Sequence, residues 1–142
     1  MKKALLCFGL ALYCSLASGQ PNFSSTSWVV LTENNEVSFL GKLHECYDST
    51  NGLRYNYLII KVENKLSVPI NLYWQTDIYI DEKLWVERDD TQKVRSLRLN
   101  AYEKRKGHCG SGDLSIIHSF IDKKSVPKLT NVKITNLKTE SL

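Results

Sequence analysis

Beyond its first twenty residues, the 142-residue sequence has only two cysteines, no long apolar run and no large excess of either charge. A membrane-spanning helix needs about twenty consecutive apolar residues, which no later segment provides. Phosphate binding normally shows as clustered Lys and Arg, whereas the short basic runs at 104–106 and 123–124 predict solvated loops. No Pro/Gly/Ser-rich linker or internal repeat divides the chain. We therefore expect one domain that neither spans a membrane nor binds nucleic acid.

The sequence also lacks the short motifs that carry most metal and catalytic sites. It has no Cys-x-x-Cys or His-x-x-x-His pair for zinc, and Ser111 lacks the Gly-x-Ser-x-Gly frame of a serine nucleophile. Residues 107–112 have the glycine spacing of a phosphate-binding loop, but Asp113 stands where that loop requires a lysine. We therefore expect no resident metal and no cofactor.

The first twenty residues differ from the rest of the chain. Two lysines precede an apolar run over residues 4–16, and three small residues follow it, ending at Gly19. This layout is typical of a secretory signal peptide. We expect residues 1–19 to be the signal peptide and residues 20–142 to form the mature domain, exported to the periplasm or the extracellular space.

A retained membrane anchor, or a lipid attached to Cys14, would be the alternatives to cleavage. The apolar run is shorter than a membrane span and is interrupted at Tyr13, Cys14 and Ser15. A lipidated cysteine requires a small residue before it, whereas Tyr13 is bulky. Cleavage therefore fits best. It lowers the formal net charge from +4 to +2, since 17 Lys and Arg then face 15 Asp and Glu.

Cleavage would leave Cys46 and Cys109 as the only cysteines of the mature domain. Cysteines usually pair in oxidising compartments, so we predict a disulfide between them. The bond would close a loop of about 63 residues and stabilise the domain by about 4 kcal/mol. A zinc site formed by these cysteines with His44 and His108 is the alternative, and it would require both thiols to stay reduced.

Apolar and polar residues alternate along most of the mature chain, with a period of two rather than 3.6. Segments rich in β-branched and aromatic residues are separated by turn-forming residues such as Asn51-Gly52. The expected strands cover residues 28–31, from 37 to about 46, 53–63, 70–80, 84–86, 94–99, 114–121 and 130–137. They predict an all-β fold, a two-sheet antiparallel β-sandwich of immunoglobulin-like architecture.

The cysteine spacing does not make the chain a true immunoglobulin domain. Such domains pack a tryptophan against the disulfide and carry a tyrosine two residues before the second cysteine. Here Trp74 is far from Cys46 in the sequence, and Gly107 occupies the tyrosine position.

The strand expected at 70–80 places a row of polar and aromatic side chains on one of its faces. Exposed tyrosines flanked by amides and carboxylates suit sugar rings or a protein partner, because each ring has a flat apolar body and a polar tip. The alternative is that a second layer or an edge loop covers this face, so that its side chains are buried and bind no ligand. The candidate ligand-binding residues are Asn71, Tyr73, Gln75, Asp77 and Tyr79.

An enzyme remains the second function class. A small hydrolase or metal-dependent enzyme would use loop residues, namely His44, Glu87, Asp89, Asp90 and His108. His118 alternates with apolar residues in an expected strand, so we interpret it as a packed histidine rather than a general base. Loop carboxylates in a charged stretch are usually only solvated, and no catalytic residue is assigned.

Several segments resemble a loose set of small exported β-sandwich proteins common in Bacteroidetes. The matching segments are Cys46-Tyr47-Asp48 and residues 58–65, 70–74, 107–109 and 129–137. The resemblance implies a fold and an exported location, and it brings no function. We therefore expect an exported, non-catalytic binding or interaction module whose partner is a protein or a glycan.

Overall fold

The computed structural model describes residues 22–85, 93–110, 112–122 and 127–142, and these residues contain nine strands and no helix. The predicted signal peptide, Ser111 and the acidic residues Glu87, Asp89 and Asp90 lie outside the described residues. The strands are β1 (Val29–Glu33), β2 (Val37–Asp48), β3 (Leu53–Asn64), β4 (Ile70–Ile80), β5 (Lys83–Trp85), β6 (Arg95–Leu99), β7 (Lys104–Lys106), β8 (Ser115–Phe120) and β9 (Leu129–Ser141).

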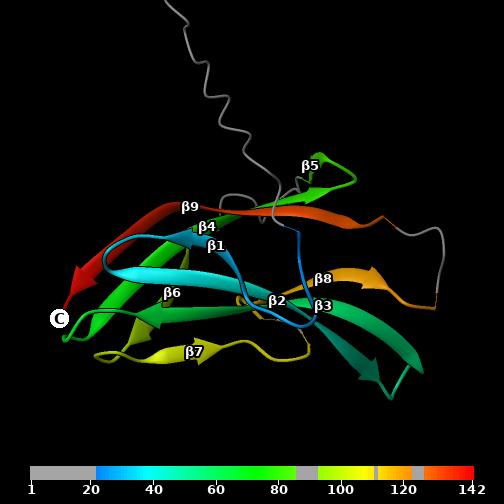
Figure 1. The fold of residues 1–142 in the computed structure, drawn as a ribbon, viewed down its shortest axis with the longest axis horizontal. Helices are drawn as coiled ribbons and strands as arrows, with labels where there is room; N and C mark the ends of the chain where they lie inside the picture. Colours follow the sequence, from blue (N-terminus) through cyan, green and yellow to red (C-terminus); the bar gives the residue numbers. More distant parts are fainter. Residues whose placement is uncertain (1–21, 86–92, 111, 123–126) are drawn as a thin grey trace, which may run out of the picture.

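The strands form two antiparallel sheets that pack face to face (Figure 1). In the first, sheet A, the order is β1-β2-β3, and β3 pairs along its free side with β8 at residues 55–59 and with β7 at residues 61–63. In the second, sheet B, β4 is central, with β9 along one side and β5 and β6 along the other. The predicted β-sandwich is therefore confirmed.

The core lies between the two sheets and is built by alternate residues of their longest strands. Phe39 of β2 and Trp74 of β4 meet edge to face, with ring centroids 5.4 Å apart. Burial of such side chains stabilises the domain by about 1.5–3 kcal/mol each. The main cluster consists of Val37, Phe39, Ile60, Val62, Ile70, Leu72, Trp74 and Leu99.

One buried amide organises the connections at the end of β3. Asn64 Nδ2 donates to the carbonyl oxygens of Val68 at 2.9 Å and Asn100 at 2.8 Å, while its Oδ1 accepts from the Leu66 N–H at 2.9 Å. The side chain is buried, and all three bonds satisfy backbone groups in loops. Asn64 therefore joins the β3–β4 turn to the loop before β7.

The basic run expected to be a loop at 104–106 is instead strand β7. It pairs with β3 so that Lys104 lies opposite Glu63 and Lys106 opposite Lys61. The Glu63 carboxylate lies 3.6 Å from Lys104 Nζ and 2.8 Å from Lys61 Nζ, which lowers the pKa of Glu63 mainly through the Lys61 hydrogen bond. The strand forms because β3 supplies both an unpaired edge and a charge of the opposite sign.

Candidate functional site

Cys46 of β2 and Cys109, in the loop after β7, form the predicted disulfide, with their Cα atoms 5.8 Å apart. The position of Cys46 is fixed by the β2–β3 ladder, in which it lies opposite Tyr55. The bond therefore attaches the loop to the outer face of sheet A, the face turned away from the core.

Hydrogen bonds to β3 and β8 hold the same loop against sheet A. The Gly107 N–H donates to the Ile60 carbonyl at 3.0 Å, and the Ile60 N–H donates to the Leu114 carbonyl at 2.8 Å. A Cβ atom at Gly107 would lie 2.0 Å from the Leu114 oxygen, so only glycine fits at this close approach. Further along, Ser115 Oγ donates to the Gly110 carbonyl at 2.6 Å. These three hydrogen bonds and the disulfide together fix the loop on sheet A.

The outer face of sheet A presents rows of side chains across β2, β3 and β8, with one irregularity in the β3–β8 pairing between Asn56 and Tyr57. One row contains Cys46, Tyr55 and Phe120, and the next contains His44, Tyr57 and Ile117. A third row contains Lys42, Ile59 and Ser115. Along the strands, the rows change from aromatic to basic. Two hollows flank the disulfide on this surface.

The first, which we call the basic hollow, has a volume of about 490 Å³. Four of its lining residues are lysines or histidines and none is a carboxylate; the lining is Trp28, Lys42, His44, Ile59, Lys106, Gly107, His108 and Cys109. Within the part of the chain that the structure describes, neither Lys42 nor Lys106 has an ion-pair partner. Nearby, Lys61 Nζ lies 4.9 Å from the centre of the Trp28 ring.

The second, the aromatic hollow, has a volume of about 400 Å³. Its ring cluster is compact: the Tyr55 and Phe120 centroids are 4.8 Å apart, and those of Tyr55 and Tyr57 are 6.2 Å apart. The lining residues are Cys46, Tyr47, Asp48, Tyr55, Tyr57, Cys109, Gly110, Ile117 and Phe120.

Two polar groups of the aromatic hollow have shifted pKa values. Burial, reinforced by the neighbouring Tyr55 and Asp48, raises the pKa of Tyr57, so its hydroxyl remains a donor. The pKa of Asp48 is lowered, chiefly by the Asn51 side chain, whose Nδ2 donates to Asp48 Oδ2 at 2.7 Å. The hollow therefore offers a protonated hydroxyl and an ionised carboxylate beside flat rings.

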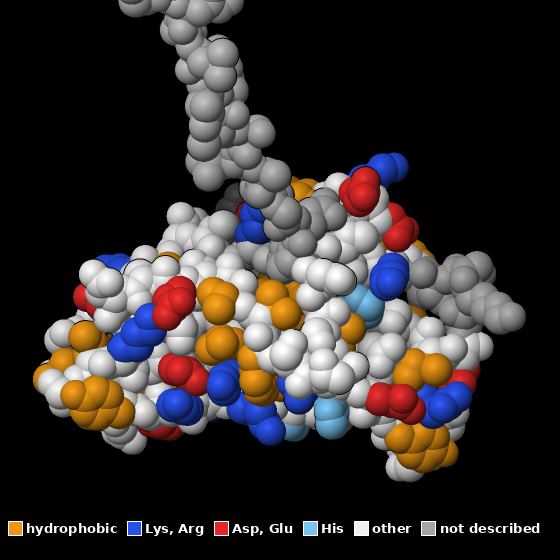
Figure 2. Space-filling view, viewed as in Figure 1, with side chains coloured by type: hydrophobic (Ala, Val, Ile, Leu, Met, Phe, Trp, Pro, Cys, Tyr) orange, Lys and Arg blue, Asp and Glu red, His pale blue; other side chains and the backbone are white. Residues whose placement is uncertain are grey.

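The two hollows adjoin, since Cys109 lines both of them. In Figure 2, Lys, Arg and His side chains gather along the lower edge of the molecule, on the side of sheet A. The disulfide thus separates a basic region from an aromatic one on a single surface.

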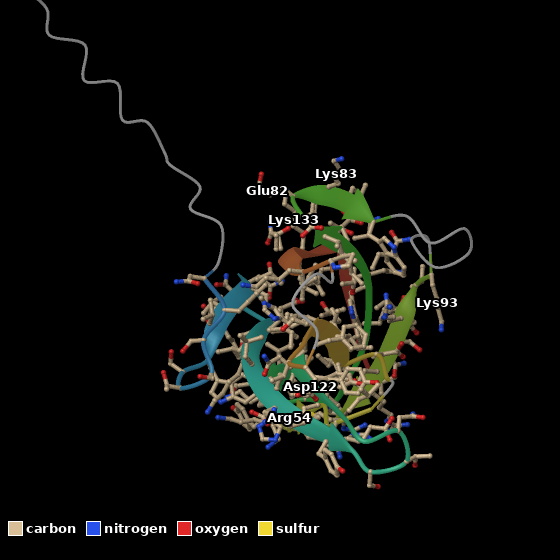
Figure 3. The ribbon with its side chains drawn as sticks, turned by 90° about the vertical axis from the view of Figure 1, so that its right-hand side faces the viewer. Arg54, Glu82, Lys83, Lys93, Asp122 and Lys133 are labelled. Atoms are coloured by element: carbon tan, nitrogen blue, oxygen red, sulfur yellow. A yellow bond between two sulfur atoms is a disulfide. The ribbon has the colours of Figure 1, made fainter. Side chains whose placement is uncertain are left out.

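The residues predicted to bind a ligand on β4 do share one face, the outer face of sheet B. All five are partly buried, and Asn71 and Tyr73 line a small hollow with Arg98 of β6. Lys133 Nζ lies 5.1 Å from the Tyr79 ring centre, and Asn136 Nδ2 donates to Gln75 Oε1. Figure 3 shows Lys133 beside the β5 turn, well away from the Arg54 and Asp122 pair of sheet A. Ligand binding by Asn71, Tyr73, Gln75, Asp77 and Tyr79 stays a prediction.

The two candidate catalytic histidines, His44 and His108, both line the basic hollow. His118 is buried, as predicted, beside a separate hollow lined by Phe23 and Lys128. Burial and, to a smaller extent, the Lys128 charge lower the pKa of His118. None of the residues lining these two hollows is a carboxylate.

Three of the four residues of the alternative zinc site also lie together, without His108. The ligand atoms of His44, Cys46 and Cys109 lie within 4.8 Å of one another. Both sulfur atoms are bonded to each other, however, and zinc binds thiolates. A metal could use this group only after reduction of the disulfide.

The sequence interpretation missed the aromatic half of the site. No ligand-binding role was assigned to the strand at 53–63. Its outer face, with Tyr55 and Tyr57, is only partly covered in the structure. Their spacing of two residues was a visible signal, whereas the proximity of Phe120, from β8, was not.

Comparison with known proteins gives little further information. No family model matches the sequence, and no curated protein matches it. Among solved structures, the chain is similar to a DUF1425 family member from Shewanella sp. pv-4, with 10% identity and a TM-score of 0.45, over 84% of this chain and 95% of that one. A likeness of this size carries no functional argument. The described residues form strands and loops, so they include no helix that could cross a bilayer.

Proposed function

We propose that the protein is an exported, non-catalytic binding module whose ligand-binding surface is the outer face of sheet A around the Cys46–Cys109 disulfide. The observation that carries the proposal is the pair of adjoining hollows that share Cys109 as a wall. Binding sites are concave and largely preformed, and here the loop between the hollows is fixed by a disulfide and by backbone hydrogen bonds.

Binding is favoured over catalysis by the composition of the two hollows. A general base is normally oriented by a partner such as a carboxylate. His44 and His108 instead share their hollow with Lys42 and Lys106. The one carboxylate of the aromatic hollow, Asp48, accepts hydrogen bonds from Thr50 and Asn51 within its own turn.

Export is supported by two independent features. The leader has the layout of a signal peptide, and a disulfide persists in oxidising compartments but is rare in the cytosol. The finer location, periplasm or extracellular space, belongs to the same proposal.

Sheet A is favoured over sheet B because its two hollows, of about 490 Å³ and 400 Å³, are larger than the hollow of about 190 Å³ that Asn71 and Tyr73 line with Arg98 on sheet B. On sheet B, Tyr79 contacts Lys133, and the pKa of Glu140 is lowered mainly by Lys138 and to a smaller extent by Tyr73. On sheet A, Lys42 and Lys106 have no ion-pair partner among the residues described. Their charges are therefore available to a ligand.

The proposal is tested by screening the exported protein against an immobilised glycan library and a fractionated envelope extract. Every glycan or purified protein that binds is then added to the isotope-labelled protein. We expect amide NMR shifts in β2, β3 and residues 107–110. Shifts concentrated in β4 and β9 would contradict the proposal and restore the sheet B face as the binding surface.

Two tyrosine variants provide a matched pair for the same experiment. Tyr57 and Tyr79 are both partly buried on the outer face of a long strand. Tyr57→Ala should weaken ligand binding at least tenfold, while Tyr79→Ala should leave it unchanged. The reverse result would show that the ligand is bound by sheet B.

A further inference from the structure

We propose that the ligand is an acidic oligosaccharide, with a carboxylate or sulfate group in the basic hollow and a neighbouring sugar ring in the aromatic hollow. This inference rests on the proposed function, because it names the ligand class of the same surface. It follows from the charge of one hollow, the shape and chemistry of the other, and the distance between them.

The basic hollow has the charge needed to bind an anion. Elsewhere on the surface, Arg54 pairs with Asp122 and Arg95 pairs with Asp113. Lys42 and Lys106, in contrast, line the same hollow as His44 and His108, and no carboxylate lines it. Like charges gathered around a concave surface repel one another, and a bound anion relieves that repulsion. An anionic group is therefore the expected occupant.

The aromatic hollow has the features that bind a sugar ring. Tyr55, Tyr57 and Phe120 present flat apolar surfaces, on which the C–H face of a sugar can pack. The Tyr57 hydroxyl can donate a hydrogen bond and the ionised Asp48 carboxylate can accept one. Sugar hydroxyls both donate and accept, so they match this pair of groups.

The separation of the hollows favours more than one sugar unit. Lys42 and Cys46 are four residues apart in β2, which corresponds to about 13 Å at the rise of a strand. A single sugar cannot contact the lysines and the aromatic rings at the same time. A short chain that carries an acidic group near one end can contact both regions.

Peptides and nucleic acids fit the same surface less well. An extended peptide usually binds by adding a strand to an unpaired sheet edge, but β2 and β3 are both paired on their two sides. Nucleic acids require several phosphate contacts, made largely by arginine and lysine. Only two lysines and no arginine line the basic hollow, and the predicted mature domain has a formal charge of only +2.

The test compares acidic oligosaccharides with neutral forms of the same backbone. One pair is trigalacturonate and its methyl ester, which isolates the carboxylate, and the other is a κ-carrageenan oligosaccharide and its desulfated form, which isolates the sulfate. Binding to the exported protein is measured by calorimetry and by the NMR signals of the tryptophan side chains. Trp28 lines the basic hollow, while Trp74 is buried in the core and Trp85 is exposed on β5. We expect at least one acidic form to bind at least tenfold more tightly than its neutral form and to shift Trp28 alone.

Charge variants supply the control. Lys42→Gln with Lys106→Gln should weaken binding of the acidic form at least tenfold and abolish its salt dependence. Lys133→Gln with Lys138→Gln removes the same number of charges from sheet B and should leave binding within twofold. All four lysines lie in strands at the surface, and the folding of each variant is checked by its thermal unfolding.

The outcomes separate this inference from the proposed function. Equal binding of acidic and neutral forms, with Trp28 shifted, would overturn the acidic class while the binding surface stands. Binding of oligodeoxythymidylate or polyglutamate in place of both saccharides would assign the hollow to another polyanion and overturn the inference. If none of these probes shifts Trp28, the inference is wrong, and the library screen then decides the proposed function.

Discussion

Gly107 and Leu114 approach so closely that a Cβ atom at Gly107 would lie 2.0 Å from the Leu114 carbonyl oxygen. The same backbone stretch exchanges hydrogen bonds with Ile60 of β3 through both residues. Close contact between the loop and the sheet therefore depends on the absence of a side chain at one position. The disulfide and this contact together determine where Cys109, the wall shared by the two hollows, is placed.

Replacement of Gly107 by alanine should destabilise the domain, because the loop must move away from β3 to admit the methyl group. We expect a loss of about 1–3 kcal/mol in the free energy of unfolding, the usual range for overpacking, measured by urea denaturation. Gly112→Ala is the matched control, since the nearest atom to its Cβ would be Ser115 Oγ at 3.8 Å. Equal stability of the two variants would contradict the close approach.

Removal of the disulfide by Cys46→Ala with Cys109→Ala should lower the free energy of unfolding by about 2–5 kcal/mol. Most of the loss comes from the greater conformational freedom of the unfolded chain. Reduction of the natural protein should have the same effect, whereas zinc or a chelator should have none. Two reactive thiols in the folded, air-exposed protein, or destabilisation by the chelator, would instead favour the metal site.

Much of the fold could be predicted because the local signals agree. The alternation of Ile70, Leu72 and Trp74 gives the correct buried face of β4, and the Asn51-Gly52 turn is present, with Gly52 at a φ of 65°. The disulfide could also be predicted, because only two cysteines remain once the leader is set aside.

The rest depends on contacts between residues that are far apart in the sequence. β7 consists of three charged residues with no apolar pattern, and it is a strand only because Glu63 and the edge of β3 lie beside it. The ring cluster likewise needs Phe120 to lie beside Tyr55, which follows from the pairing of β8 with β3. Neither arrangement has a local signal in the sequence.

Asn64 should be one of the polar residues most sensitive to substitution. Asn64→Leu removes the donor to Val68 and Asn100 and the acceptor for Leu66, and it leaves their backbone groups unpaired. We expect a loss of about 2–4 kcal/mol, since each lost bond costs about 1 kcal/mol. Asn35→Ala, at an exposed turn position, should change stability by less than about 0.5 kcal/mol. Similar values for the two variants, measured by denaturation, would show that the buried amide has no structural role.

His118 should make the stability of the domain depend on pH. The side chain is only 8% exposed, and burial followed by the Lys128 charge lowers its pKa from the ordinary value of 6.5. In the unfolded chain the imidazole takes up a proton at that ordinary value, so the unfolded state binds more protons just below it. Stability from neutral His118 is therefore complete above the unfolded pKa and is lost as the pH falls toward the lower folded value.

The measurement is the free energy of unfolding between pH 8 and pH 5 for the natural protein and for His118→Gln, which cannot take up the proton. Within the affected range, the two curves should differ in slope by at most about 1.4 kcal/mol per pH unit, the effect of one proton. The exposed His44 and His108 are present in both proteins, so the difference isolates His118. Parallel curves over the whole range would mean that His118 is protonated equally easily in the folded and unfolded states. That result would contradict the lowered pKa of the buried His118.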